Sequence, residues 1–185
     1  MTAAELLSIA AFAEGRHVQA FPSFGSERTG APVVAFCRID DKPIRSREPI
    51  SEPDGLIVQD PTLLHQVDVF SGLVPDGHIL INSSRSFDEL GLGELSERFR
   101  PERLLTVPAS ELAREHLGRP IPNVALLGGF AALSGLISLG SVTSAVREKF
   151  SGKPGEGNAR AAAGAFEFVE QEMKELKELK ELTNA

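Results

Sequence analysis

The sequence contains no tryptophan and no tyrosine, and its single cysteine is Cys37. One cysteine forms no intrachain disulfide, which fits a reducing cytosol and predicts a cytoplasmic protein. One cysteine also cannot hold an iron–sulfur cluster. Because the usual large aromatic anchors of protein interfaces are missing, an interface of this chain would draw on arginines and on some of the 11 phenylalanines.

Positive charge is in deficit as well. Lysine and arginine together number 19, aspartate and glutamate 26, and the net charge is −7. A general nucleic-acid binder needs surplus cations to neutralise phosphates, so the composition argues against that class. A local basic patch remains open, because Lys42, Arg45 and Arg47 lie close together in the sequence.

The strong catalytic motifs are missing too. The chain has no His or Cys pair at metal-ligand spacing, no G-x-S-x-G, no Walker loop and no intact G-x-G-x-x-G. Its four histidines are scattered, which predicts packing or surface roles. Cys37 lies in an apolar run, where a small buried hydrophobic residue is expected and a nucleophile is not.

A long uncharged stretch raises the question of a membrane span. No charged residue occurs between Arg119 and Arg147, and "VALLGGFAALSGLISLGSV" is long enough to cross a bilayer. Glycines and serines interrupt it, and Leu139-Gly140-Ser141 is typical of a helix end followed by a new N-cap. We therefore predict two helices of a soluble fold and no membrane span.

Short apolar runs predict the strands. They lie at 33–39, 56–59, 78–82 and 104–107, with a further short strand at 17–21. The run at 33–39 is apolar on both faces, which is typical of a strand covered on both sides. Helical patterns precede, separate and follow these runs; they lie at 2–14, 62–70, 110–117, 123–138 and 141–150. The alternation predicts an α/β fold with some parallel strand pairs.

The C-terminal part is expected to differ from the rest. Ser151–Gly157 is rich in glycine and predicts a linker or turn, with a last helix starting near Asn158. That helix ends in "KELKELKEL", whose period of three lets the leucines drift around the helix. We expect an α/β domain over 1–157 and, over 158–185, a helix with a solvated charged tail. A partner-binding helix is the alternative for the tail.

One loop is the best candidate for ligand binding. In "FPSFGSERTGAP", the backbone and hydroxyl groups of Ser26, Thr29 and Gly30 could meet an anion, and Arg28 could form a forked pair with a phosphate. A plain turn is the alternative, because Gly, Pro and Ser mark turns in any protein. Asp60 and Asn82 lie at the ends of predicted strands, where α/β proteins often place functional groups, although both residue types are also common in turns.

The run "AEGRHVQAFPSFGSERTGAPVVAFCRIDDKPIR" resembles the gamma subunits of the 2-oxoacid:ferredoxin (acceptor) oxidoreductases, in particular the pyruvate and ketoisovalerate branches. The resemblance continues through "EPDGLIVQDPTLL", "ILINSS" and "PNVALLGGFAAL" and covers most of residues 2–170. It implies a three-layer, Rossmann-like α/β fold, with a sheet flanked by helices.

The resemblance also implies a division of labour. The complex converts a 2-oxoacid, coenzyme A and an oxidised acceptor such as ferredoxin into acyl-CoA, CO₂ and reduced acceptor. Thiamine diphosphate, Mg²⁺ and 4Fe–4S clusters are expected in partner subunits of alpha, beta and delta (ferredoxin-like) type. This chain alone would bind no cofactor and would not be catalytic, and it would help to form the coenzyme A pocket.

Within this picture, Ser26, Arg28, Thr29 and Gly30 are the candidate coenzyme A contacts. An intersubunit ion pair is an equal alternative for Arg28, since arginine is enriched at interfaces. Two other classes of function stay open. One is a stand-alone α/β nucleotide- or phosphate-binding protein, and the other is a purely structural interaction module.

The sequence departs from the family pattern at its start. Family members normally begin with a strand and a G-x-G-G-Q-G turn, whereas this chain begins at the helix that follows them. We expect the native protein to extend upstream of Met1. The intact mass of the native subunit would test this expectation.

Overall fold

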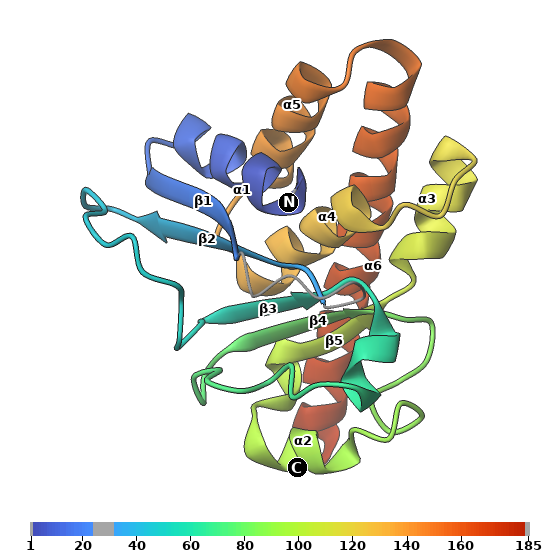
Figure 1. Cartoon of the computed structure of the whole chain (residues 1–185). Coiled ribbons are helices and arrows are strands. Elements are labelled where there is room, and N and C mark those ends of the chain that lie inside the picture. The colour runs from blue at the N-terminus through green and yellow to red at the C-terminus, as the bar shows by residue number, and fades with distance from the viewer. Residues whose placement is uncertain (1, 24–31, 184–185) are drawn as a thin grey trace.

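A computed structural model describes residues 2–23 and 32–183 (Figure 1). In chain order its elements are α1 (Thr2–Ala13), β1 (His17–Ser23), β2 (Val34–Asp40), β3 (Gly55–Val58), the 3₁₀ turn η1 (Pro61–His65), β4 (His78–Asn82), α2 (Gly93–Arg98), η2 (Pro101–Arg103), β5 (Leu104–Val107), α3 (Ala109–Leu117), α4 (Asn123–Ser134), α5 (Leu139–Lys149) and α6 (Gly152–Thr183). The predicted α/β class is confirmed. The segment 62–70, predicted to be a helix, is helical only over residues 62–65 of η1, because Pro61 and the Asp60 cap favour a single tight turn.

The strands form two separate sheets. β3, β4 and β5 are parallel in the order β3-β4-β5, and β1 and β2 form an antiparallel hairpin. In the parallel sheet Ile79 of β4 pairs with Leu56 on one side and Leu104 on the other.

Both faces of the parallel sheet are covered, which makes three layers. Leu80 and Leu105 point toward α4 and α6 and join a core with Leu126 and other helical residues. Ile79 and its neighbours pack on the opposite face against Leu95 of α2 and against loops. Figure 1 shows the long helix α6 running behind the sheet and α2 below it.

The hairpin is covered differently. Val18, Cys37 and Ile39 point toward α1 and join a core with helices α1, α4, α5 and α6. On the other face of β2, Val34 is 46% exposed and Phe36 belongs to none of the three cores formed by the described residues. The prediction that this strand is covered on both sides is therefore wrong, because an antiparallel hairpin needs no crossover helix on its second face.

The uncharged stretch forms two helices, as predicted. α4 ends at Gly135, which adopts a left-handed conformation (φ 63°) and closes the last turn. α5 then begins after Ser138, whose hydroxyl oxygen accepts a hydrogen bond from the backbone N–H of Ser141 at 3.1 Å. In the described part of the chain no helix has both the length and the apolar character that a membrane crossing requires.

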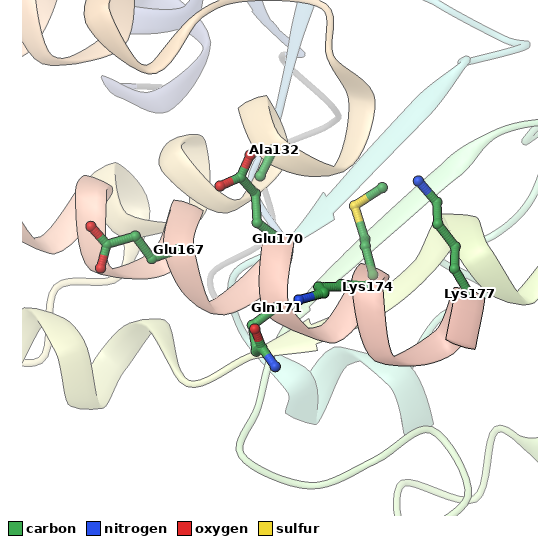
Figure 2. Close-up of a pocket in the computed structure, with 7 residues that line it drawn as sticks. Ala132, Glu167, Glu170, Gln171, Lys174 and Lys177 are labelled. Atoms are coloured by element: carbon green, nitrogen blue, oxygen red, sulfur yellow. The ribbon is translucent and has the colours of Figure 1, made fainter. Parts of the chain in front are cut away.

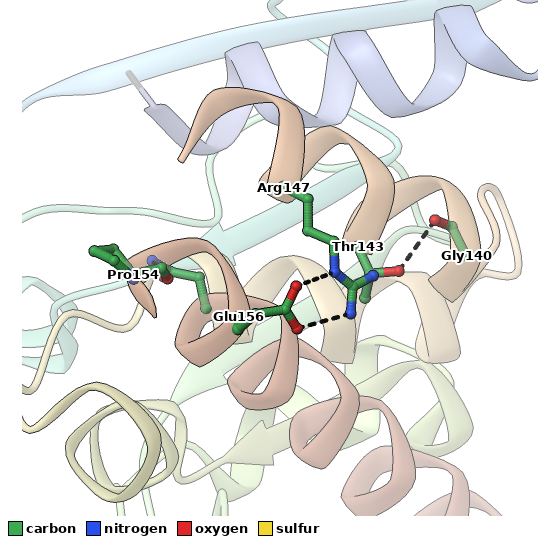
Figure 3. A network of polar contacts seen from close by, with 6 residues as sticks. Gly140, Thr143, Arg147, Pro154 and Glu156 are labelled. Atoms are coloured by element: carbon green, nitrogen blue, oxygen red, sulfur yellow. Dashed lines mark hydrogen bonds and ion pairs between the residues drawn. The ribbon is translucent and has the colours of Figure 1, made fainter. Parts of the chain in front are cut away.

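The predicted linker at 151–157 is wrong, because α6 begins at Gly152 and is continuous to Thr183. Gly155 is buried in the first turns, and a Cβ there would lie 1.9 Å from the carbonyl oxygen of Phe150. Glycine at this position permits close packing between α5 and α6. Figure 3 shows the ion pair that joins the same two helices, with Nε of Arg147 2.8 Å from Oε1 of Glu156.

Candidate functional site

The four predicted coenzyme A contacts, Ser26, Arg28, Thr29 and Gly30, lie outside the described residues. The structure does describe the two chain segments that hold this loop. Ser23, the last residue of β1, pairs with Val34, the first residue of β2. The loop therefore joins two hydrogen-bonded strands, and its ends are fixed at one end of the hairpin.

A second candidate site lies where the parallel strands end. The side chain of Asn82, the last residue of β4, donates through Nδ2 to the carbonyl oxygen of Gln59 and to Oγ of Ser110, at 2.9 Å each. Its Oδ1 accepts the backbone N–H of Ser110 at 3.0 Å. One amide thus joins the residue after β3, the end of β4 and the N-terminus of α3, and it caps that helix in the absence of a local cap.

Asp60 has an equally local role. Its Oδ1 accepts the hydroxyl of Thr62 at 2.7 Å and the backbone N–H of Thr62 at 2.9 Å, which caps η1. These two hydrogen bonds, the hydroxyl first, lower the pKa of the Asp60 carboxyl below its usual value. At this edge of the sheet Asn82 holds β3, β4 and α3 together, whereas Asp60 only caps the turn η1.

A cleft of about 320 Å³ lies beside the hydrogen-bonded pair Asn82 and Ser110. It is lined by Pro61, Asn82, Ser83, Ser84, Arg85, Pro108, Ser110 and Glu111. Its polar side chains are hydroxyls, an amide, one exposed guanidinium and one carboxylate, which suit a polar ligand. Asn82 was recognisable in the sequence as a strand-end residue. Its partner Ser110 was missed, because only the packing of α3 brings the two together.

A wider cleft of about 490 Å³ lies along α6 (Figure 2). It is lined by Ala132, Glu167, Glu170, Gln171, Met173, Lys174 and Lys177. The charges are mixed and partly paired within α6, since Nζ of Lys174 lies 4.0 Å from Oε1 of Glu178. The cleft offers an amphipathic surface and no arrangement of a nucleophile with a base.

Metal binding and thiol chemistry have little support in the described part of the chain. Within residues 2–23 and 32–183 no three His, Cys, Asp or Glu side chains gather as metal ligands would. Burial between the hairpin and α1 raises the pKa of the Cys37 thiol to about 11. A thiol with that pKa is protonated at neutral pH, as expected for a packing residue.

The architecture defines an α/β protein with a small parallel sheet, a separate hairpin and a helical cover. Its sequence matches the pyruvate ferredoxin/flavodoxin oxidoreductase family over residues 1–168, and the chain belongs to that family. The resemblance to the gamma subunits of that family is confirmed by the relatives that follow.

The chain is 50% identical, over 167 residues, to the pyruvate/ketoisovalerate oxidoreductases common subunit gamma of Pyrococcus abyssi, covering 90% of this chain and 89% of the relative. It is 46% identical, over 171 residues, to the pyruvate synthase subunit PorC of Methanothermobacter thermautotrophicus, covering 92% and 89%. The crystal structure of the pyruvate oxidoreductase subunit PORC from Thermotoga maritima is similar with a TM-score of 0.73 and 30% identity, covering 90% of this chain and 87% of that one.

Proposed function

We propose that this chain is the gamma component of a multisubunit 2-oxoacid:acceptor oxidoreductase. In that complex it assembles with alpha-, beta- and delta-type subunits and contributes to the coenzyme A pocket. The observation that carries the proposal is the 50% identity to a common gamma subunit over nearly the whole of both chains. The reaction is the oxidative decarboxylation of a 2-oxoacid to acyl-CoA.

The residues of this chain do not fit the redox and decarboxylation cofactors of such a reaction. A single cysteine cannot ligate an iron–sulfur cluster. The described residues offer no group of carboxylates and histidines for the metal that would accompany thiamine diphosphate. These groups are therefore assigned to the partner subunits, and the contribution of this chain is binding and assembly.

Co-expression tests the assembly part. A tagged chain produced together with the other oxidoreductase subunits of the same genome should retain large partners and the brown colour of iron–sulfur clusters. A colourless homo-oligomer that ignores those subunits would contradict the proposal and favour the stand-alone phosphate-binding alternative.

The loop that joins β1 to β2 is proposed to contact coenzyme A through Ser26, Arg28, Thr29 and Gly30. A phosphate contact is made in the ground state and the transition state alike, so Arg28→Ala should raise KM for coenzyme A by about tenfold or more with kcat almost unchanged. Arg119→Ala, an exposed arginine beyond α3, is the matched control. An unchanged KM in an intact complex would refute this contact, and loss of a subunit would assign Arg28 to an interface.

A further inference from the structure

The hairpin has two faces of different character. The cross-strand register places the pairs Gln19–Arg38, Phe21–Phe36 and Ser23–Val34 on the face that points away from α1. We call this set of residues the outer face. Figure 1 shows the hairpin at the margin of the molecule, with α1 packed beside it.

The outer face is apolar at its centre and pre-ordered. The rings of Phe21 and Phe36 lie with their centroids 5.3 Å apart, and the guanidinium of Arg38 lies 5.4 Å from the centroid of the Phe21 ring. Nη1 of Arg38 also donates to Oε1 of Gln19 at 3.0 Å. Among the described residues no core includes these two phenylalanines, and the neighbouring Val34 is 46% exposed.

A basic segment borders this apolar centre. Nη2 of Arg38 donates to the backbone carbonyl oxygen of Glu48, which ties the end of the segment 42–48 to the outer face. Arg45 and Arg47 of that segment are exposed, and no carboxylate of the described residues lies within ion-pair distance of either.

Two acidic side chains nearby in sequence are engaged locally, whereas the exposed carboxylate of Glu48, next to Arg47, forms no ion pair among the described residues. Oδ1 of Asp41 lies 2.6 Å from Nε of Arg16, and Oδ1 of Asp40 accepts the backbone N–H of Lys42 at 3.0 Å. The segment 42–48 thus carries three cations, Lys42, Arg45 and Arg47, against the single carboxylate of Glu48, in a chain whose net charge is −7.

We infer that the outer face, together with the segment 42–48, docks onto a partner subunit that presents an apolar patch bordered by aspartate and glutamate. This inference rests on the proposed function and names the surface through which the chain joins the complex. Aromatic side chains and arginine are the residue types that carry most interface energy, and an acidic rim complements the unpaired cations.

Two other occupants fit less well. In a two-fold dimer this face would meet its own copy, which presents the same exposed arginines and no rim of aspartate and glutamate to complement them. A nucleic acid would need a wider basic surface, and the net charge opposes it. Sedimentation of the chain alone and its binding to duplex DNA test these two occupants, and association in either measurement would contradict the proposed partner.

The test measures binding of the purified chain to the complex of the remaining subunits, expressed from the same genome without this one. Arg45→Glu/Arg47→Glu should weaken binding by about thirtyfold or more at low salt, with a smaller loss near 0.5 M salt because screening reduces the charge term. Phe36→Ala should weaken it by about tenfold at both salt concentrations.

The control is Arg119→Glu/Lys153→Glu, which changes the net charge equally at two exposed cations that form no ion pair among the described residues. It should bind within about threefold of wild type. If the wild type binds and the 45/47 pair matches the control, the surface assignment is overturned and the proposed function stands. If the wild type does not bind the other subunits, both are overturned. A cooperative melting transition well above the assay temperature confirms for each variant that it is folded.

Discussion

The two β-sheets of this protein are built from similar apolar residues and differ in what covers them. In the parallel sheet, Ile79, Leu80 and Ile81 are completely buried, because helices, turns and loops of the same chain lie on both faces. In the hairpin one face packs on α1, whereas Val34 on the other face is 46% exposed. The two sheets therefore differ in how far other elements pack over their faces, and not in how hydrophobic their residues are.

Connectivity explains the difference. Parallel neighbours must be joined by crossovers, and those crossovers return over the faces of the sheet and bury it. The hairpin strands are neighbours in sequence and pair without a crossover helix between them, and one face of the hairpin packs on α1 among the described residues. The second face of the hairpin is only partly covered among the described residues, and this is the basis of the docking surface proposed above.

The largest expected effect comes from breaking the helical cover of the parallel sheet. A Cβ on Gly128 of α4 would lie 1.9 Å from the carbonyl oxygen of Ala162 in α6, so Gly128→Ala forces the two helices apart. We expect a loss of about 3 kcal/mol or more in the free energy of unfolding, measured by urea denaturation. Gly140→Ala is the control, since its nearest neighbour would be Oγ of Ser138 at 3.8 Å, and it should stay within about 1 kcal/mol of wild type.

Truncating one large apolar side chain to alanine in each sheet measures how much its burial contributes to stability. Leu80→Ala empties a fully buried site and should cost about 3 kcal/mol of unfolding free energy. Phe36→Ala removes a larger side chain, yet in the isolated subunit it should cost only about 1 kcal/mol, because the ring is only partly buried. Equal losses in urea denaturation would show that the outer face is already covered within the chain.

The strands of the parallel sheet were predictable because their signals are local. β4 and β5 lie at the predicted 78–82 and 104–107, each a short apolar run bounded by turn residues or proline. The pairing of β2 was not predictable, since the apolar pattern on both of its faces says nothing about which strand lies beside it. The glycines of 152–157 indicate a linker by composition, and only their contact with α5 shows why they belong to a helix.

The candidate site was predictable to a smaller extent. Asn82 could be recognised as a strand-end residue, but its three hydrogen bonds depend on where η1 and α3 lie after folding. The roles of Ser26, Arg28, Thr29 and Gly30 rest on the family resemblance and remain predictions.

Cysteine reactivity sharpens the comparison between the two faces of the hairpin. Burial raises the pKa of Cys37 to about 11, so its thiolate fraction at pH 8 should be roughly a hundredfold below that of an exposed cysteine. Iodoacetamide labelling followed by mass spectrometry should therefore be slower by about that factor in the folded chain than in urea. Rapid labelling of the folded chain would mean that the face toward α1 opens readily, and the two faces would then differ little.

The smallest expected effect concerns the hydrogen bonds between Glu14, which follows α1, and Ser138, which precedes α5. These two helices belong to the core on which the hairpin packs. Oε1 of Glu14 accepts the backbone N–H and the hydroxyl of Ser138, at 2.8 Å each. Hydrogen bonding, with the backbone N–H of Ser138 first, lowers the pKa of Glu14 in the folded state. The stability it contributes is therefore present at neutral pH and is lost as the pH falls below the usual glutamate pKa and through the lower pKa of the folded state. Because Glu14 is exposed, Glu14→Gln should cost only a few tenths of a kcal/mol at pH 7, and the difference from wild type in urea denaturation should shrink as the carboxylate is protonated in acid. A difference that grows as the pH falls would contradict this role for the carboxylate.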